Sequence, residues 1–272
     1  MSVLETTGSL PECETLLIIR DGDVVTVAMN RPEARNAMNS LMMRELRDVF
    51  TAFYVDPAQA RCIVLTGTGD KAFCAGADLK ERNGMDDANW RRQHAIVEQA
   101  IRAMMACPVP IISAVNGAAF AGGCELALAS DFIYAVEGAR FAQTETALGI
   151  IPGAMGTQNL PRAVGVRRAK ELILSARPFT AVEGEHWGLV NELFPDVAQL
   201  REAAAKTAQT IAGNAPVAVR QAKAAVDKAA DLDRGNGYAY EIEAYNRTVG
   251  TEDRREGIAA FNDKRSPDFK GR

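Results

Sequence analysis

The sequence predicts an α/β domain with right-handed β-α-β crossovers, followed by an all-helical region. Short apolar runs typical of strands alternate with helical patterns along the first part of the chain, and strand patterns disappear beyond about residue 200. Glycine-rich turns stand where strands give way to helices. The length of 272 residues and the hydrophobic content of 47% provide for a sizeable core. We therefore expect residues 1–200 to form the α/β core and residues 201–272 to form a helical C-terminal region.

The first elements have the pattern of a β-hairpin. Leu16–Arg20 and Val24–Met29 are β-type runs, and Asp21-Gly22-Asp23 between them supplies a tight turn. Apolar residues at helical spacing then predict a helix over Asn39–Phe53. Cys62–Leu65 is typical of a short buried strand.

Helices and strands continue to alternate after this strand. A second helix is predicted over Ala88–Ala106, and Pro108 ends it before the strand Ile111–Val115. A Gly/Ala-rich turn leads into a short apolar helix over Cys124–Ser130, and Phe132–Ala135 is the next strand. This alternation indicates parallel strands joined by crossover helices.

Helical patterns dominate the rest of the chain. Thr180 and Glu183 have the spacing of a capping box, which predicts the start of a helix. Thr251 is the expected N-cap of the last helix, because Glu252 and Asp253 follow it. Four helices are expected in the C-terminal region: residues 201–213, 216–230, 236–249 and 252–264.

Composition excludes several classes of function. The net charge of −4 argues against nucleic acid as the main partner, because phosphate binding needs a basic surface. Five cysteines without a C-x-x-C motif and only two histidines favour a reduced, cytoplasmic protein without a metal site. The first 14 residues lack the pattern of a signal peptide, and no apolar run is long enough for a membrane span.

Three segments rich in small residues could approach a ligand through their backbone N–H groups. They are Phe73–Leu79, Asn116–Glu125 and Gly149–Gly156. None has the full pattern of a dinucleotide-binding loop or a P-loop. Any one of them, taken alone, is more often a structural turn than a binding site.

Two glutamates stand beside these segments in otherwise small and apolar surroundings. Glu125 follows Gly122-Gly123, and Glu145 precedes the third segment. Each could equally be a surface residue or a functional acid. Burial would raise the pKa of either carboxyl and suit it to proton transfer near neutral pH.

Several segments, in the same order along the chain, resemble the enoyl-CoA hydratase/isomerase (crotonase) family. The resemblance covers nearly the whole chain and is closest to enoyl-CoA hydratases and methylglutaconyl-CoA hydratase-like members. It rests on Asn30–Asn39, Phe73–Glu81, Ala114–Ala127, the region of Gln143 and Glu145, Ile151–Gln158 and Glu256–Arg265.

The resemblance implies a crotonase-like spiral of β-β-α units and a helical C-terminal region that builds homotrimers or hexamers. It implies an acyl-CoA substrate, no cofactor beyond the coenzyme A of that substrate, and a role in fatty acid metabolism such as β-oxidation. Ala77 and Gly122 would supply the backbone N–H groups of an oxyanion hole. Glu125 would orient and deprotonate water, and Glu145 would protonate the α-carbon, although the pair could titrate as a unit.

Contacts with coenzyme A are also implied by the resemblance. Arg35 and the segment Ala75–Leu79, with Ala75, Asp78 and Leu79, are expected to line the channel for adenosine and pantetheine. Phe261 and Lys264 resemble residues that meet coenzyme A from a neighbouring subunit. A solvated helix end is the alternative for Lys264.

Alternatives remain within and beyond this family. The runner-up is an enoyl-CoA isomerase or another crotonase-type acyl-CoA reaction, including methylglutaconyl-CoA hydration. Both glutamates favour hydration, because isomerases often keep only one. RNA binding is disfavoured, because the helix that carries lysines in some relatives has here Arg44 and Arg47 balanced by acids.

A few residues depart from the family pattern or have unremarkable interpretations. Ala121 and Met155 replace frequent glycines, and Met155 is expected to reshape the acyl pocket. Cys74 and Cys124 are expected to serve packing rather than catalysis. His94 is expected to lie on a helix surface rather than to act as a base.

Overall fold

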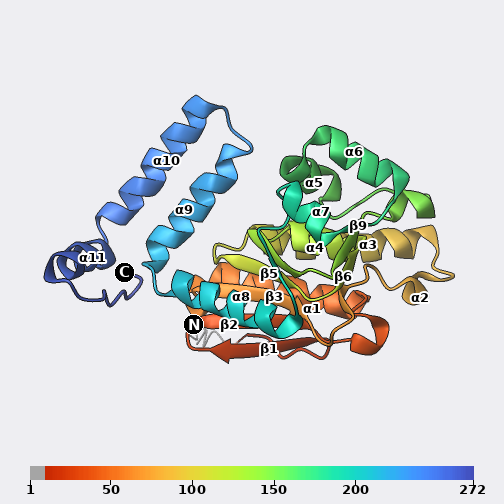
Figure 1. Ribbon diagram of the computed structural model, residues 1–272, viewed down its shortest axis with the longest axis horizontal. Helices are drawn as coiled ribbons and strands as arrows, with labels where there is room; N and C mark the ends of the chain where they lie inside the picture. Colours follow the sequence, from red (N-terminus) through yellow and green to blue (C-terminus); the bar gives the residue numbers. More distant parts are fainter. Residues whose placement is uncertain (1–9) are drawn as a thin grey trace, which may run out of the picture.

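The computed structural model describes residues 10–272 and contains two β-sheets with helices around them (Figure 1). The larger sheet has six strands in the order β1-β2-β3-β5-β7-β10. The first two strands pair antiparallel, and every later neighbour is parallel. The strands are β1 (Leu16–Asp21), β2 (Val24–Met29), β3 (Cys62–Gly67), β5 (Ile111–Val115), β7 (Phe132–Val136) and β10 (Glu192–Phe194).

The smaller sheet consists of short strands that stand beside the larger one. Its order is β4-β6-β8-β9, with β8 and β9 antiparallel. From β3 to β8, successive strands of the chain therefore enter the two sheets in turn. The strands are β4 (Ala72–Cys74), β6 (Ala118–Phe120), β8 (Arg140–Ala142) and β9 (Phe179–Thr180).

Helices cover both sheets, and the core between these layers is apolar and well buried. Helices α1 and α3 lie against each other, and α5 against α6. The helices of this part are α1 (Ser40–Val55), α2 (Leu79–Arg82), α3 (Asp87–Met105), α4 (Gly122–Leu128), α5 (Gly156–Val164), α6 (Val166–Ser175), α7 (Ala181–His186) and α8 (Val197–Ala212). The 3-10 turns are η1 (Pro32–Ala34), η2 (Pro57–Gln59) and η3 (Glu145–Leu148).

Three further helices form an arm that extends away from the sheets (Figure 1). They are α9 (Pro216–Ala229), α10 (Arg234–Val249) and α11 (Glu252–Asp263). Lys223 of α9 ties the arm to the core through an ion pair of 2.8 Å with Asp131. Arg61 donates a hydrogen bond to the carbonyl oxygen of Phe269.

The structure confirms the predicted elements with small shifts at their ends. The hairpin forms with Gly22 in its turn at φ +58°. Asn39 caps α1 by accepting a hydrogen bond from the N–H of Met42. Thr180 and Glu183 form the predicted capping box at the start of α7. The two caps are strong local signals because each satisfies N–H groups that a helix start leaves unpaired.

The expected division at residue 200 falls inside α8, and the packing of this helix places it with the core. Leu200, Ala204 and Ala208 of α8 are fully buried, and the helix lies against β3, β5, β7 and β10. Small apolar residues at helical spacing explain this close approach to the sheet. The helices that leave the core begin with α9.

No helix within residues 10–272 combines the length and apolarity needed to cross a membrane. Most of the segment on which the expected lack of a signal peptide depends, residues 1–9, lies outside the described residues.

Candidate active site

A cavity of about 690 Å³ opens between the two glycine-rich turns and helix α3. The four central residues of the predicted site, Ala77, Gly122, Glu125 and Glu145, all line it. Much of the remaining wall is apolar and comes from Met38, Met43, Val97, Leu148, Ile150 and Ile151. Apolar wall beside the two central acids suits a ligand whose reacting atoms must be kept from bulk water.

The turns that carry Ala77 and Gly122 touch each other through Gly76. This glycine has φ +95°, and a Cβ added to it would lie 2.9 Å from the carbonyl oxygen of Phe120 and 3.5 Å from the nitrogen of Gly122. Only glycine therefore permits both the backbone conformation and the close approach. Neither the N–H of Ala77 nor that of Gly122 finds an acceptor among residues 10–272. Two residues of the cavity wall thus carry backbone donors without an acceptor in residues 10–272.

A short stretch of parallel pairing holds the Ala77 turn in place. Met38 receives a hydrogen bond of 2.9 Å from the N–H of Asp78 and donates one of 2.8 Å to the carbonyl oxygen of Gly76. Arg31 forms an ion pair of 3.0 Å with Asp78. Burial would raise the pKa of Asp78, but hydrogen bonds from Arg31 and from the N–H groups of Glu81 and Lys80 lower it overall.

Glu125 projects from the first turn of α4 and is only 3% exposed. Its Oε1 accepts hydrogen bonds of 2.8 Å each from the N–H groups of Ala154 and Gly156. Burial raises the pKa of this carboxyl, whereas the two hydrogen bonds oppose the rise because they favour the ionised form. The other oxygen, Oε2, lies 4.0 Å from the position that a Cβ on Gly122 would occupy, so the carboxylate stands close to the unpaired donors.

Glu145 is the first residue of η3 and is 6% exposed. Neither of its oxygens has a hydrogen-bond partner among residues 10–272. Burial raises its pKa to about 7, with a further contribution from the neighbouring charge of Glu125. This carboxyl is therefore divided between its acid and base forms near neutral pH.

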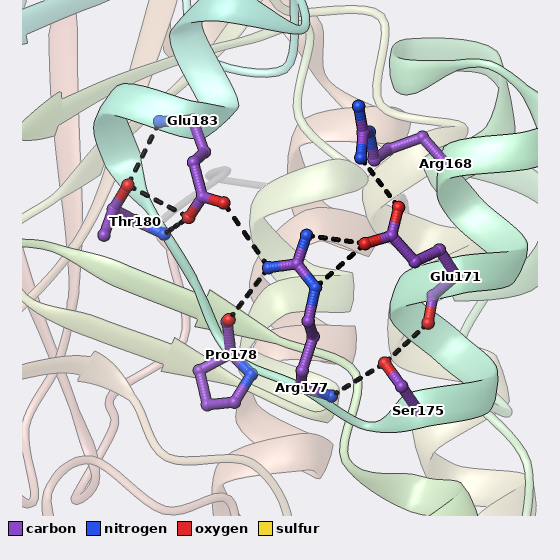
Figure 2. Close-up of polar contacts among 7 residues, drawn as sticks. All are labelled: Arg168, Glu171, Ser175, Arg177, Pro178, Thr180 and Glu183. Atoms are coloured by element: carbon purple, nitrogen blue, oxygen red, sulfur yellow. Dashed lines mark hydrogen bonds and ion pairs between the residues drawn. The ribbon is translucent and has the colours of Figure 1, made fainter.

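The turn η3 is attached to α6, which belongs to a network of charges on the molecular surface. Thr146 Oγ1 donates a hydrogen bond of 2.7 Å to the carbonyl oxygen of Ile173. Figure 2 shows Arg177 between Glu171 of α6 and Glu183 of α7, with Nη2 2.9 Å from Glu171 Oε1. Glu183, which pairs with Arg177, also forms the capping box of α7 with Thr180, so the same network links α6 to the start of α7 (Figure 2).

Two features of the site were missed or misjudged from the sequence. Gln143 is fully buried, and its amide lies beside the thiol of Cys124, where it opposes the rise that burial causes in the pKa of that thiol. His94 is not a simple helix-surface residue, because it lines the cavity and its ring lies against Gly153. The missing side chain of Gly153 leaves room for this ring. A glycine-rich segment facing a helix was the only signal available in the sequence.

Other expectations have mixed outcomes. Ala75 and Leu79 line the cavity, but Asp78, Arg35, Phe261 and Lys264 do not. Asp78 instead pairs with Arg31, and the carbonyl oxygen of Arg35 accepts a hydrogen bond from the N–H of Ala75. Phe261 and Lys264 lie on α11, in the arm (Figure 1). Their predicted contact with a neighbouring subunit stays a prediction.

The departures from the family pattern fall at unusual backbone positions. Ala121 has φ 49° and ψ −124°, and Met155 has φ 73°. Met155 lines a neighbouring cavity of about 470 Å³ rather than the one with the two acids. Cys74 and Cys124 are fully buried, and burial raises the pKa of each thiol to about 12, so neither has the character of a nucleophile. No group of three potential metal ligands occurs within residues 10–272.

Two interleaved sheets, a helical arm, and a cavity with buried acids beside unpaired backbone donors define an enzyme of the crotonase-fold class. The model of the family described as enoyl-CoA hydratase/isomerase matches residues 20–272. The chain belongs to this family, as the resemblance had indicated.

Individual relatives cover almost the whole chain. A crystal structure of an enoyl-CoA hydratase from Bacillus anthracis superposes with a TM-score of 0.92 at 42% identity, covering 95% of this chain and 100% of that one. The short-chain-enoyl-CoA hydratase of Clostridium acetobutylicum is 37% identical over 96% of this chain and 100% of its own length. The human enoyl-CoA hydratase domain-containing protein 2, mitochondrial, is 40% identical over 93% of this chain and 87% of its own length.

Proposed function

We propose that this enzyme adds water to a short-chain or branched trans-2-enoyl-CoA and releases the 3-hydroxyacyl-CoA. The observation that carries the proposal is the shared cavity, in which Glu125 and Glu145 are buried beside the unpaired N–H groups of Ala77 and Gly122. The relative from Clostridium acetobutylicum, named as a short-chain-enoyl-CoA hydratase, supports the same reaction and chain length.

The backbone donors would bind the thioester carbonyl oxygen. Charge develops on this oxygen when a nucleophile attacks the β-carbon, because the electron pair of the double bond moves toward the carbonyl. Donors fixed by the backbone need no reorganisation as this charge grows. Each such donor contributes roughly 3–4 kcal/mol to stabilising an oxyanion. Ala77 and Gly122 would therefore hold the enolate intermediate.

The two carboxylates would divide the proton transfers. Glu125 receives two backbone hydrogen bonds that favour its ionised form, which suits the group that deprotonates water as the new C–O bond forms. Glu145 has no such partner, and its pKa of about 7 leaves it protonated in part at neutral pH. Glu145 would therefore deliver a proton to the α-carbon, and addition would be of the syn type. Glu125 then loses the proton taken from water and Glu145 regains a proton, by exchange with solvent, which restores the starting state.

The proposal is tested by measuring turnover of a panel of enoyl-CoA thioesters and identifying the products. Crotonyl-CoA and its branched analogues should lose their conjugated absorbance and yield 3-hydroxyacyl-CoA. E125Q and E145Q should each lower kcat by about 100- to 10,000-fold, the range of general acid–base catalysis. E98Q is the matched control, because Glu98 also lines the cavity but is half exposed at its rim.

Two outcomes would contradict this assignment. An isomerase that uses one acid would tolerate one of the two glutamine substitutions and would move a double bond without adding water. A different acyl-CoA reaction would leave all the enoyl thioesters untouched.

We also propose that the arm binds further copies of the chain. Helices α9 and α10 bury few of their own residues, and Val226, Tyr238 and Tyr245 are between 62% and 72% exposed. Exposed apolar surface of this kind is typical of protein interfaces. Light scattering coupled to size-exclusion chromatography should give a trimer or hexamer, and a monomer at micromolar concentration would contradict the proposal.

A further inference from the structure

The loop that donates hydrogen bonds to Glu125 has few contacts of its own. Ala154 and Gly156 each donate an N–H group to Glu125 Oε1 at 2.8 Å. Over residues 151–154, the bond from Ala154 is the one hydrogen bond to the rest of residues 10–272. Gly153 and Ala154 line both the cavity with the acids and the neighbouring cavity of about 470 Å³. A loop with open volume beside it and one hydrogen bond needs packing to stay in place.

The ring of His94 supplies such packing from α3. A Cβ added to Gly153 would lie 2.5 Å from Cε1 and 2.9 Å from Nε2 of His94. These distances are shorter than van der Waals contact allows, so the imidazole occupies the space of the side chain that Gly153 lacks. The φ of Gly153 is not positive, so its backbone conformation is open to any residue. The ring of His94, rather than the backbone, therefore requires glycine at this position.

The imidazole acts on the loop through its shape. Its Cε1–Nε2 edge faces Gly153, since Nδ1 is farther from the same point, at 3.6 Å. Nε2 lies 3.7 Å from Glu98 Oε1, which is too long for a hydrogen bond. The contact with the loop is therefore van der Waals packing of a planar ring, and it does not need the imidazole nitrogens.

This contact lies one residue away from the bond to the acid. Gly153 precedes Ala154 in the chain, so a shift of Gly153 into the space of the ring moves the N–H of Ala154 as well. Glu125 would then lose a donor that favours its ionised form, while it stayed buried. Both the position and the ionisation of this carboxylate thus depend on how firmly the loop is held.

We infer that His94 is a positioning residue for the hydration reaction, because its ring holds Gly153 and Ala154 in the place from which the loop orients Glu125. The inference rests on the proposed function, since the role of Glu125 as the group that activates water belongs to that function. His94 itself transfers no proton, and another planar ring of similar size can replace it.

Hydrogen exchange of the full chain measures how firmly the loop is held, without reference to activity. In His94→Ala, the peptide that contains residues 151–156 should exchange about 10-fold faster or more, because the ring no longer opposes opening of the loop. His94→Phe restores a planar ring and should exchange at nearly the wild-type rate. Arg91→Ala is the matched control, because Arg91 of α3 lines the same cavity but is mostly exposed and lies near Asp87.

Hydration kinetics measure the consequence for Glu125. His94→Ala should lower kcat about 10-fold and leave KM within about three-fold, because the ring acts on the acid and not on the substrate. The acidic limb of the pH profile of kcat should move upward by about one pH unit, the size expected for weakening a hydrogen bond to a charged group. His94→Phe should keep kcat and the pH profile.

A second variant approaches the same contact from the loop. Gly153→Ala must displace the ring and should behave as His94→Ala does. In the double variant the added methyl group occupies the vacated space, so its loss of kcat should be smaller than the product of the two single losses. If His94→Ala does not fold, as judged by circular dichroism, Gly153→Ala supplies the same comparison.

Three results would overturn the inference. Equal losses of kcat in His94→Ala and His94→Phe would make His94 an acid or a base. A raised KM with an unchanged kcat would make it a contact for the substrate. Unchanged exchange of the loop peptide would show that the loop needs no support from the ring. Failure of the proposed function would instead appear as absence of hydration by the wild type, with the difference in exchange still present.

Discussion

Glu125 and Glu145 enter one cavity from two regions that support them differently. Glu125 stands on α4 behind a strained turn, and a loop 29 residues further along the chain donates two backbone N–H groups to it. Glu145 stands on a single 3-10 turn, and no group within residues 10–272 bonds to its carboxyl oxygens. One region is therefore fixed around its carboxylate, and the other leaves its carboxyl available to a ligand.

This difference separates the chemistry of two identical side chains. Hydrogen bonds to a carboxylate favour its ionised form, whereas burial without hydrogen-bond partners favours the protonated form. Two titratable groups whose surroundings differ in this way are suited to opposite roles in one proton-transfer reaction.

The largest effect is expected from crowding the Glu125 side. A Cβ at Gly156 would lie 2.8 Å from Glu125 Oε1 and 2.7 Å from Gln143 Oε1, so Gly156→Ala forces a rearrangement around the carboxylate. We expect kcat for hydration to fall roughly 100-fold, the cost of misplacing a reacting group by about 1 Å. Gly149→Ala on the Glu145 side is the comparison, because nothing lies within 4 Å of the added Cβ. It strains the backbone at φ +76° but should change kcat less than about three-fold. Comparable losses of kcat in both variants would show that the surroundings of Glu125 are no more sensitive to crowding than those of Glu145.

The next effect is the pH dependence of stability. The pKa of Glu145 is raised from 4.5 to about 7 in the folded chain. The folded state therefore binds more protons than the unfolded state between these values, and the stabilising contribution present below pH 4.5 is lost as the pH rises through 7. We expect this group to lower the free energy of unfolding by about 2 kcal/mol between pH 5 and pH 8.

Urea unfolding of the wild type and of Glu145→Gln at both pH values measures this contribution. The glutamine variant should lose most of this decrease with pH, and the remainder comes from other groups whose pKa burial raises, Glu125 and Asp227 among them. An unchanged pH dependence in the variant would show that Glu145 titrates normally.

The sequence could predict the parts of the site that depend on neighbouring residues, but not those that depend on residues far apart along the chain. The two acids and the two donor positions, which line one cavity in the structure, could be proposed because a charged residue among glycines and alanines is unusual and because the segments match the family. The hydrogen bonds to Glu125 could not be predicted, because the N–H groups of Ala154 and Gly156 come close to its carboxylate only in the folded chain. The smaller sheet was also missed, because strands of two or three residues are too short to show periodicity.

The structure gives a physical reason for the glycines that are frequent in the family at positions 121 and 155. Both residues have positive φ, which is where a Cβ is costly and where glycine is favoured. The sequence interpreted Met155 as bulk in the acyl pocket, whereas it lies in the neighbouring cavity. The sequence predicted a helix-surface position for His94 but not its contact with Gly153, because this glycine belongs to a distant loop.

A smaller effect is expected from relieving the backbone behind Glu125. Ala121→Gly removes the strain at φ 49° and ψ −124°, which costs roughly 1–3 kcal/mol for a residue with a Cβ. The added freedom of glycine in the unfolded chain offsets about 0.5–1 kcal/mol of this. We expect a net gain near 1 kcal/mol in the free energy of unfolding, measured in urea. A loss of stability would mean that the turn around Ala121 is not strained.

The smallest effect on stability is expected from the hydrogen bond that joins η3, which carries Glu145, to α6. Thr146→Val removes the hydrogen bond to the carbonyl oxygen of Ile173 and should cost about 1 kcal/mol, seen as a fall of about 2–4 °C in Tm. Arg177→Met breaks the network of Figure 2, but its pairs are exposed and should contribute less than the half-buried Thr146 bond. Because Thr146 is adjacent to Glu145, its variant should also lower kcat a few-fold while Arg177→Met leaves kcat unchanged. The reverse order would mean that the surface network, rather than the turn itself, holds Glu145 in the cavity.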